Sequence, residues 1–597
     1  MGGVTGGLPV VSICAQPARG QPAPLEFDGV GRVVAVSDLH GAHEAFVATL
    51  LAAGVLDGAQ AWAGGRTHLV VLGDLLDRGD HSRASLDLLM RLEGEAAAAG
   101  GRVHVVLGNH DVMNLVGDLR YVTRGEFAAF AAEETASQRE AAYARHLERH
   151  GAGGQALSRP DFDARFPPGY FAHRAAFAAS GPYGRWLLGK PLALRIDGTL
   201  FVHAGLAAGF GAASIEALDR PLRAGLAEYA ALLEQAVAAG WLEPTTDFYD
   251  VPAVLGGLDV ATLTPDGAAL LERLRELHGS PLHTTLSPTW YRGNAGCSPL
   301  VEQDRLADLL RGFGARRVVI GHTPTWRRQA WRRLGDRVWM IDGGMQSAYY
   351  SGQGVALVLE GDAAAAVYQG ESRRVPVATL PARAGALSAD LDPEELEGAL
   401  ASAGIVAGDV TPAGAVLVLR WRDADLRALA RALAAADAAP EVAAYRVDRL
   451  LDLAMVPAAV LRRLEGRDFV LQHLPPSLVA EARRAAGEVR LDAWCPLPDQ
   501  WRAMHVFDAL IGHASRSAEH LSYVAGTGQL VLAGHEAAFP VSASVPQDPQ
   551  LLELAGRPLW RERLAALGSA AARGRFLEVL GERQYEALLR RARALAR

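Results

Sequence analysis

The 597-residue sequence has a single lysine, Lys190, and only three cysteines, Cys14, Cys297 and Cys495. The cysteines are scattered, which fits neither a disulfide framework nor a zinc site with closely spaced ligands. No apolar run reaches the ~18 residues that a membrane-spanning helix needs. The net charge of −8 excludes the basic character of a general nucleic-acid-binding protein. Chemistry that depends on lysine is possible only where Lys190 lies.

The remaining composition is that of a globular protein with more than one domain. Half of the residues are hydrophobic and 21% are charged, and a chain of this length normally divides into two or more cores. The sequence predicts a disordered or signal-like N-terminus over residues 1–30, rich in Gly and Pro. A first domain follows over residues 31–372, then a linker over 373–392 with little periodicity, and a second domain over 393–597.

Polar side chains follow apolar, β-branched runs at several points in the first domain. Predicted strands at Arg32–Ser37, His68–Leu72 and Val103–Leu107 each end in a Gly-containing polar loop before a helix. This is the βα corner of an α/β protein, which places side chains at the sheet edge where ligands bind. Asp197-Gly198 predicts a hairpin, and a later strand covers Arg317–Ile320. Residues 115–190 are predicted to form an insertion over the site, with a helix at Glu126–His150 followed by Gly/Pro turns, and residues 212–275 are predicted to be mostly helical.

The polar residues after these strands have the chemistry of a two-metal site. Carboxylate, imidazole and amide groups suit divalent metals, and such a site needs one bridging carboxylate and a few terminal ligands. Asp74 can bridge, Asp38 and His40 would complete one ion, and Asn109, His203 and His322 would complete the other. Each residue alone has an ordinary explanation as a helix cap or turn residue. The prediction therefore rests on their combination.

Four further side chains suit phosphate hydrolysis at this site. Arg78 and Arg292 are planar donors for phosphate oxygens. His110 can protonate the leaving alkoxide, and Asp77 can hold the other ring nitrogen of His110. These four residues are the predicted catalytic groups.

The motifs SDLHG, GDLLDRG, GNHD, VHAGL, WYRG and IGHT, in this order, resemble those of calcineurin-like metallophosphoesterases. They are most similar to the phosphoprotein phosphatase branch and its bacterial, Shewanella-like members. The resemblance covers about residues 30–370. It implies a ββ sandwich flanked by helices, two divalent metal ions (Mn, Fe or Zn), and hydrolysis of phosphomonoesters, with a phosphoprotein as the expected substrate. The residue roles given above agree with it position by position.

Two departures from that branch leave the substrate open. Asp111 stands where the branch usually has Glu, and Ser37 begins a motif that usually begins with Gly. GNHD also occurs in relatives that cleave dinucleoside polyphosphates, but their second motif usually lacks the acid that Asp77 supplies here. We therefore expect a phosphomonoesterase. A dinucleoside polyphosphate hydrolase and a catalytically dead scaffold are the alternatives.

The second domain resembles atypical kinase-like domains related to lipid and secreted-protein kinases, so an α+β fold is expected for it. EVAAYRVDRLLDL, FDALIGH and LVLAGHEAAF carry the resemblance, but Ser515, His520 and Gly534 stand where the catalytic Asp and the metal-binding Asn and Asp should be. Phosphoryl transfer needs Mg²⁺ held by acids and positioned cations, and the domain also has no lysine. We expect a pseudokinase that regulates the phosphatase or binds a protein partner. An unrelated helical domain is the alternative.

The short apolar stretch before Cys14 weakly resembles the end of a secretory signal peptide. Small residues follow it, but a basic start is missing. We therefore expect a periplasmic or exported protein in preference to a cytoplasmic one.

Overall fold

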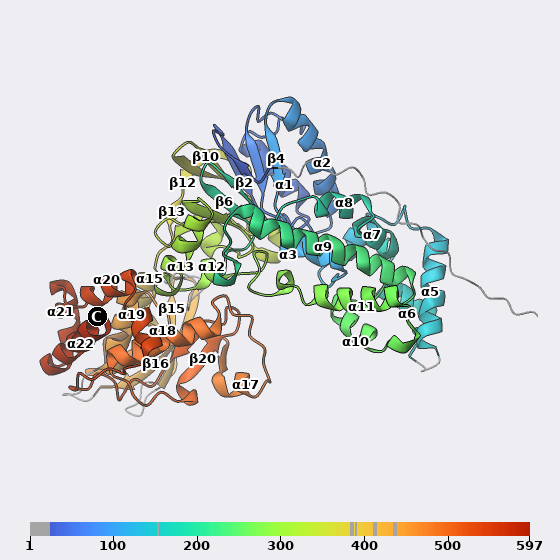
Figure 1. Ribbon diagram of the computed structural model, residues 1–597. Coiled ribbons are helices and arrows are strands. Elements are labelled where there is room, and N and C mark those ends of the chain that lie inside the picture. Colours follow the sequence, from blue (N-terminus) through green and yellow to red (C-terminus); the bar gives the residue numbers. More distant parts are fainter. Residues whose placement is uncertain (1–23, 152–154, 383–386, 388–390, 410–414, 434–438) are drawn as a thin grey trace, which may run out of the picture.

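The structure is a computed structural model that describes residues 24–151, 155–382, 387, 391–409, 415–433 and 439–597. The signal-like stretch lies outside these residues. Figure 1 shows the strands of the first domain in blue, green and yellow, and the C-terminal unit in yellow-orange to red beside α13. Among the described helices, none is both long and apolar enough to span a membrane.

Two mixed β-sheets form the centre of the first domain. One sheet contains, in spatial order, β12 (Glu371–Pro376), β11 (Ala363–Tyr368), β10 (Val355–Glu360), β2 (Val33–Val36), β3 (His68–Val71) and β4 (Arg102–Val105). The other contains β1 (Glu26–Phe27), β5 (Ala193–Ile196), β6 (Thr199–Val202), β7 (Arg317–Ile320), β9 (Val338–Met340), β8 (Trp331–Arg333) and β13 (Ala378–Thr379). The predicted ββ sandwich is thus confirmed.

Alternation along the strands explains why the sheets lie against each other. Ala35 and Val70 of one sheet pack with Phe201 and Val319 of the other in a core between them. The neighbouring residue Val34 points to the opposite face, into a core that the flanking helices cover. Because side chains alternate along a strand, an unbroken apolar run serves both faces of a sheet that is covered on both sides.

Parallel pairing brings the ends of several strands to one edge. Val36 of β2 pairs with Val71 of β3, which pairs with Val105 of β4. In the second sheet, Phe201 of β6 pairs in parallel with Val319 of β7. The loops after these strands therefore leave the sandwich at matching levels, where their polar side chains can meet.

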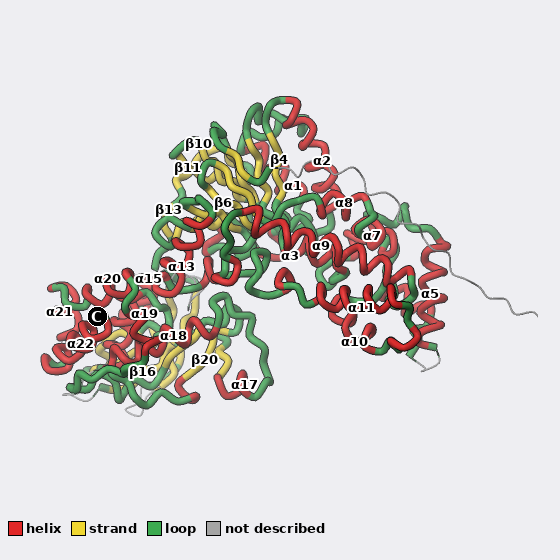
Figure 2. The backbone as a smooth tube through the Cα atoms, viewed as in Figure 1, coloured by secondary structure: helices red, strands yellow, loops and turns green. Residues whose placement is uncertain are grey.

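Helices surround the sandwich and form a separate helical region. They are α1 (His43–Ala52), α2 (Ser82–Ala98), α3 (Asn109–Val116), α4 (Arg124–Ala128), α5 (Ala136–His150), α6 (Arg159–Arg165), α7 (Tyr170–Phe177), α8 (Pro182–Leu188), α9 (Ile215–Ala238), α10 (Val251–Gly256), α11 (Pro265–His278), α12 (Gly293–Gly296), α13 (Pro299–Gly312) and α14 (Ser347–Tyr350). Figure 2 shows α5, α10 and α11 away from the yellow strands of the sandwich. The helical prediction for Glu126–His150 is confirmed in part, because a break separates α4 from α5, and residues 212–275 are mostly helical as predicted.

The C-terminal unit has an α+β fold built on one antiparallel sheet. The sheet order is β14 (Gly404–Ala407), β15 (Ala415–Trp421), β16 (Ala424–Ala432), β18 (Arg467–His473) and β17 (Ala459–Leu464), and a smaller sheet holds β19 (Leu478–Ala480), β20 (Leu521–Val524) and β21 (Leu530–Leu532). The helices are α15 (Pro393–Ser402), α16 (Pro440–Leu451), α17 (Glu481–Ala485), α18 (Leu497–Ile511), α19 (Pro549–Ala555), α20 (Pro558–Ala566), α21 (Ala570–Leu577) and α22 (Glu582–Leu595).

The first domain and the C-terminal unit are in closer contact than the sequence predicts. The core of the C-terminal unit includes Cys297, Leu300 and Val301 of the first domain. A disulfide bond joins Cys297 to Cys495 across 198 residues of sequence. Cysteines so far apart give no local pattern, which is why the sequence did not indicate this bond.

Two boundary predictions need correction. Glu26 and Phe27 are not unstructured, because β1 pairs in parallel with β5. The linker predicted at 373–392 begins later, because β12 pairs with β11 and β13 pairs with β8. Both segments are short or lie at a sheet edge, so their pairing depends on partners distant in the sequence.

Candidate active site

The residues predicted as metal ligands occupy sharp turns directly after the strands. Asp38, His40, Asp74 and His322 have positive φ angles of 52°, 45°, 51° and 64°. This left-handed conformation is uncommon for residues other than glycine and costs free energy. It persists where surrounding contacts fix it, and such residues cluster at functional sites. Here the turns direct four polar side chains towards one point between the strand ends.

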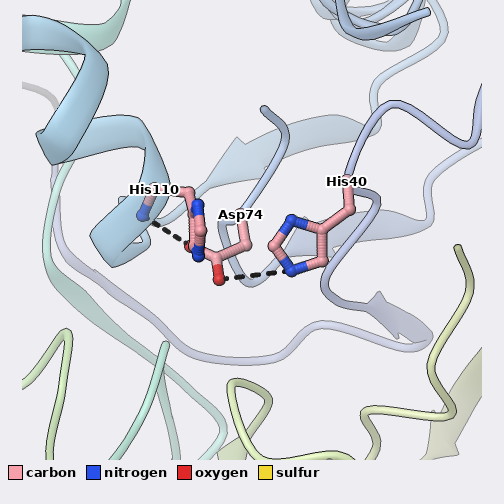
Figure 3. A group of neighbouring side chains, drawn as sticks. All are labelled: His40, Asp74 and His110. Atoms are coloured by element: carbon pink, nitrogen blue, oxygen red, sulfur yellow. Dashed lines mark hydrogen bonds and ion pairs between the residues drawn. The ribbon is translucent and has the colours of Figure 1, made fainter. Parts of the chain in front are cut away.

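Asp74 lies at the centre of this group. Its Oδ1 accepts a hydrogen bond from the backbone N–H of His110 at 2.9 Å. Its Oδ2 lies 3.6 Å from Nε2 of His40 and 3.3 Å from Nε2 of His203. Figure 3 shows His40 and His110 on opposite sides of Asp74, with the carboxylate between them. One carboxylate therefore faces two separate sets of ligand atoms.

Hydrogen bonds to backbone carbonyls orient the imidazole rings. Nδ1 of His40 donates to the carbonyl of Leu76 at 2.9 Å, and Nδ1 of His203 donates to that of Leu72. Since a carbonyl oxygen can only accept, Nδ1 of each ring carries a proton, and in the neutral form of the ring Nε2 carries the lone pair. A backbone partner on one ring nitrogen, with the other aimed into the site, is the usual arrangement of a metal-binding histidine.

The atoms facing one another across the site are mostly electron-pair acceptors. Nε2 of His203 lies 3.1 Å from Oδ1 of Asn109 and 3.3 Å from Oδ2 of Asp74. Nε2 of His322 is buried without a hydrogen-bond partner in the described part of the chain. A cation satisfies such a converging set, so the residues present fit a metal centre.

The geometry groups the possible ligands into two triplets that share Asp74. They are His40, Asp74 and His110, and Asp74, His203 and His322, and the ligand atoms of each triplet lie within 4.8 Å of one another. Asp38 lies beside both triplets. Its Oδ1 is 4.0 Å from Nε2 of His40, and both its oxygens accept from the backbone N–H of His322. All six predicted ligands therefore meet in one buried site.

Burial sets the charge balance of the site. Burial, and next the neighbouring Asp342, raise the pKa of Asp38 well above its ordinary range. Burial also raises the pKa of Asp342 to about 6. For His40 and His322, burial lowers the pKa well below 6.5, so both rings are neutral at neutral pH. Neutral imidazoles are the metal-binding form, and a dication would compensate the crowded carboxylates.

The predicted proton donor and its partner are in contact. Nδ1 of His110 lies 2.5 Å from Oδ2 of Asp77, and Oδ1 of Asp77 accepts from the side-chain amide of Asn114 at 2.9 Å. Asp77 is fully buried, and the two bonds fix both of its oxygens. The pair can hold the His110 ring in one orientation with Nε2 available for proton transfer.

The two predicted phosphate-binding arginines contact different predicted metal ligands. Nη1 of Arg78 is 2.6 Å from Nε2 of His40, and three tyrosine rings surround its guanidinium at 5.0–5.3 Å. Nη1 of Arg292 donates to the carbonyl of His322 at 2.8 Å and to Oγ1 of Thr323 at 3.0 Å. Each arginine is therefore held beside a predicted metal ligand, where a phosphate on the metals would reach it.

Several further residues belong to the site. Asp342 follows β9 in an Asp-Gly-Gly turn, the same signal that identified the other acids. Asp111 was noted only as a departure, yet it accepts the backbone N–H groups of Gly108, Asp74 and Leu75 and so fixes the turn that carries Asp74. Tyr121, Tyr349 and Tyr350, which surround Arg78, carry no local signal.

Comparison with known proteins agrees with this site. Residues 31–325 match the calcineurin-like phosphoesterase family. Over 203 residues the chain is 33% identical to Shewanella-like protein phosphatase 2 of Arabidopsis thaliana, covering 33% of this chain and 52% of the plant protein. Over 100 residues it is 32% identical to Shewanella-like protein phosphatase 1 of Plasmodium berghei, covering 17% of this chain and 28% of that protein. The chain thus spans about half the length of the plant relative.

A solved structure, the cold-active protein-tyrosine phosphatase of a psychrophilic Shewanella species, matches with a TM-score of 0.36 at 22% identity. The match covers 59% of this chain and 81% of that one. All six predicted metal ligands lie within the family match, and they converge on Asp74. Residues 31–325 therefore form a calcineurin-like phosphoesterase domain, related in sequence to the Shewanella-like protein phosphatases.

Proposed function

We propose that the protein is a metal-dependent phosphomonoesterase that acts on phosphoproteins through a dinuclear metal centre. The observation that carries the proposal is the pair of triplets that share Asp74, in the first of which we assign His40 as a metal ligand and His110 as the proton donor. A carboxylate between two sets of histidines suits two ions placed side by side. The flanking arginines supply the donors that a phosphate needs.

The predicted site residues have three separate roles, in binding metal, binding phosphate and donating a proton. Asp38, His40 and Asp74 would hold one ion, and Asp74, Asn109, His203 and His322 the other. When bound, the ions supply a metal-activated water as nucleophile and positive charge for the phosphate oxygens. Arg78 and Arg292 hold and orient the phosphate. His110, oriented by Asp77, gives a proton to the leaving oxygen.

The test compares three substrates on the full chain with added Mn²⁺. We expect hydrolysis of p-nitrophenyl phosphate and of phosphopeptides, and little hydrolysis of diadenosine tetraphosphate. Preference for the dinucleotide would favour the alternative dinucleoside polyphosphate hydrolase. No metal-dependent hydrolysis of any substrate would favour a catalytically dead scaffold.

For the C-terminal unit we propose a non-catalytic, kinase-like domain that regulates or targets the phosphatase. At the expected catalytic position Ser515 is exposed, and the neighbouring Arg516 pairs with Asp508 at 2.6 Å. Both oxygens of Glu441 are engaged by His535, through its backbone N–H and its Nδ1 at 2.8 Å. These pairings use the nearby acids in protein contacts, which leaves the region poorly suited to hold Mg²⁺.

We also propose that the protein works in an oxidising compartment, in line with the expected export. The disulfide between Cys297 and Cys495 supports this location, because such bonds persist in the periplasm or outside the cell and are rare in the cytosol. Thiol titration of protein purified from its native compartment, without reductant, tests the bond directly.

A further inference from the structure

A cavity of about 900 Å³ lies between the phosphoesterase domain and the C-terminal unit. The first domain contributes Pro324, Arg328 and Arg333 to its wall, and the C-terminal unit contributes Trp494 and Arg563. Its volume lies towards the upper end of the 300–1,000 Å³ range of ligand sites, which often form at domain interfaces. The proposed chemistry above makes no use of it.

The cavity lies next to the two predicted phosphate-binding arginines. Tyr350 lines the cavity, and its ring centroid lies 5.7 Å from that of His40 and 5.1 Å from the guanidinium carbon of Arg78. Trp494 lines it as well, and the centroid of its ring lies 6.0 Å from the guanidinium carbon of Arg292. A substrate whose phosphate contacts both arginines would thus extend its neighbouring atoms into this space.

The wall from the C-terminal unit is firmly attached. Cys495, next to Trp494, forms the disulfide with Cys297. Gly296 lies so close to Trp494 that an added Cβ would be 2.6 Å from the tryptophan Cβ. Oγ of Ser298 donates to the backbone carbonyl of Asp452 at 2.7 Å. Trp494 is therefore held at the edge of the phosphoesterase site as a fixed part of the wall.

The wall carries positive charge. Among its described residues are four arginines, Arg327, Arg328, Arg333 and Arg563, and a single carboxylate, Asp452. Arg327 pairs with Glu395 at 2.7 Å. The other three donate to backbone carbonyls, as with Arg328 to Tyr350 at 3.0 Å, and of these Arg333 also has the negative charges of Asp452 and Glu302 nearby. Carbonyl oxygens fix a guanidinium without cancelling its charge, so the cavity favours an anionic ligand.

The positions of the arginines favour one kind of anionic ligand over another. Arg328 comes from the 3₁₀ turn Trp326–Arg328, Arg333 from β8, and Arg563 from α20 on the other domain. Guanidinium groups on three elements suit several separated carboxylates better than one compact polyphosphate group. The lining also includes apolar side chains such as Leu334, Leu380 and Leu453, which suit the aliphatic parts of a peptide.

We propose that this cavity binds acidic residues next to the phosphorylated residue of a polypeptide substrate, so that the C-terminal unit selects acidic phosphoprotein segments. The inference rests on the proposed phosphatase function and names its substrate class. It also gives the C-terminal unit a direct part in substrate binding.

The first test measures selectivity on the full chain with Mn²⁺ at low salt. Two phosphopeptides share the phosphorylated residue and differ only in flanking Glu or Gln residues. We expect kcat/KM to be ~10-fold higher for the acidic peptide, and the ratio to fall as salt screens the arginines. Arg563→Gln should lower the ratio several-fold. Arg561→Gln is the matched control, because Arg561 is exposed on the same helix and does not line the cavity.

A second measurement separates the cavity from catalysis. Calorimetry with the non-phosphorylated acidic peptide and EDTA-treated full chain should detect binding that Arg563→Gln weakens and Arg561→Gln leaves unchanged. If no ester is hydrolysed but this binding occurs, the proposed function fails and the cavity site stands. Equal kcat/KM for both peptides, or no binding of the acidic peptide, overturns the inference. Binding of ATP, without metal, in preference to the peptide would identify a nucleotide site and overturn it too.

Discussion

Asp74 is the residue on which the site most depends, because both ligand triplets include its carboxylate. Asp74→Asn keeps the shape of the side chain but removes the charge that two cations would share. We expect loss of most bound metal and of nearly all hydrolysis, measured as metal per chain by elemental analysis and as turnover of p-nitrophenyl phosphate. Asp308→Asn, on the exposed face of α13, is the control. Two metals per chain with near-normal turnover in Asp74→Asn would contradict the bridging role.

For His110, the loss of activity on replacement should depend on the leaving group, because a proton donor matters most when the leaving group is poor. His110→Asn should lower turnover of an alkyl phosphate by ~10²–10⁴-fold. The loss should be much smaller for p-nitrophenyl phosphate, since p-nitrophenolate leaves without protonation. An equal loss on both substrates would indicate that His110 has only a structural role, in the turn where its backbone N–H donates a hydrogen bond to Asp74.

Arg292 tests the geometry of phosphate binding. Its Nη1 is already fixed by His322 and Thr323, so the guanidinium is oriented before substrate arrives. Arg292→Lys should raise KM and weaken inhibition by inorganic phosphate while leaving the metal content unchanged, because an ammonium group cannot reproduce the planar fork. Steady-state kinetics with phosphate as inhibitor measures this. Unchanged KM and inhibition in the lysine variant would remove Arg292 from the phosphate site.

At the scale of residues, the site residues that could be predicted from the sequence are those in local turn motifs. The six ligands follow strands and belong to recognisable turns, so their convergence was predictable. Tyr350 and Trp494 could not be found in this way, because they reach the site only through tertiary packing. Asp342 is an intermediate case, because it follows β9 in an Asp-Gly-Gly turn like those of the predicted acids but belongs to none of the quoted motifs.

At the scale of elements, the site depends on how closely the corners after β3 and β4 approach each other. A Cβ on Gly108 would overlap Oδ1 and the backbone nitrogen of Asp74. Gly108→Ala should therefore displace Asp74, lower both the unfolding temperature and the metal content, and reduce turnover. Gly94→Ala is the matched control. Gly94 is exposed within α2 with open space around it, so alanine should stabilise by ~0.5–1 kcal/mol.

Thermal unfolding and metal analysis of the two glycine variants decide this point. Equal stability and metal content in Gly108→Ala and the native chain would show that the corners have room to separate.

The accuracy of the predicted strands follows from burial. The predicted strand Arg317–Ile320 coincides with β7, because its apolar run is buried. β12 was placed in the linker, because it is an edge strand with exposed, charged residues such as Arg373 and Arg374. Edge strands often carry charge, which removes the pattern that identifies a strand. The two-residue strand β1 is too short to give any periodic signal.

At the scale of the whole molecule, the disulfide joins units whose contact the sequence did not reveal. Replacing both Cys297 and Cys495 by Ser should reduce the free energy of unfolding by ~2–4 kcal/mol, the usual effect of removing a disulfide that closes a long loop. Denaturant unfolding measures it, and treating the native chain with reductant should reproduce it. A change below ~0.5 kcal/mol in both experiments would show that the shared core alone holds the units together.

The proposed lack of kinase activity concerns the whole C-terminal unit, and its test needs the full chain. The core of this unit includes Leu300 and Val301, so an isolated C-terminal fragment would expose apolar surface that is normally covered. Ser515 and His520 offer no carboxylate, and the salt bridge to Arg516 occupies Asp508. Mg²⁺ would have few oxygen ligands here, and without a lysine a nucleotide would lack its usual phosphate anchor.

We therefore expect no Mg²⁺-dependent binding of a non-hydrolysable ATP analogue to the full chain, measured by calorimetry, and no phosphate transfer from ATP to any protein substrate. Replacing Arg516 by Ala frees Asp508 and provides the control, because weak Mg²⁺-dependent binding gained in this variant would show that the salt bridge blocks an otherwise suitable acid. Micromolar binding to the native chain that EDTA abolishes would mean that other acids of the unit hold the metal. Phosphate incorporation into a substrate would make the unit an active kinase.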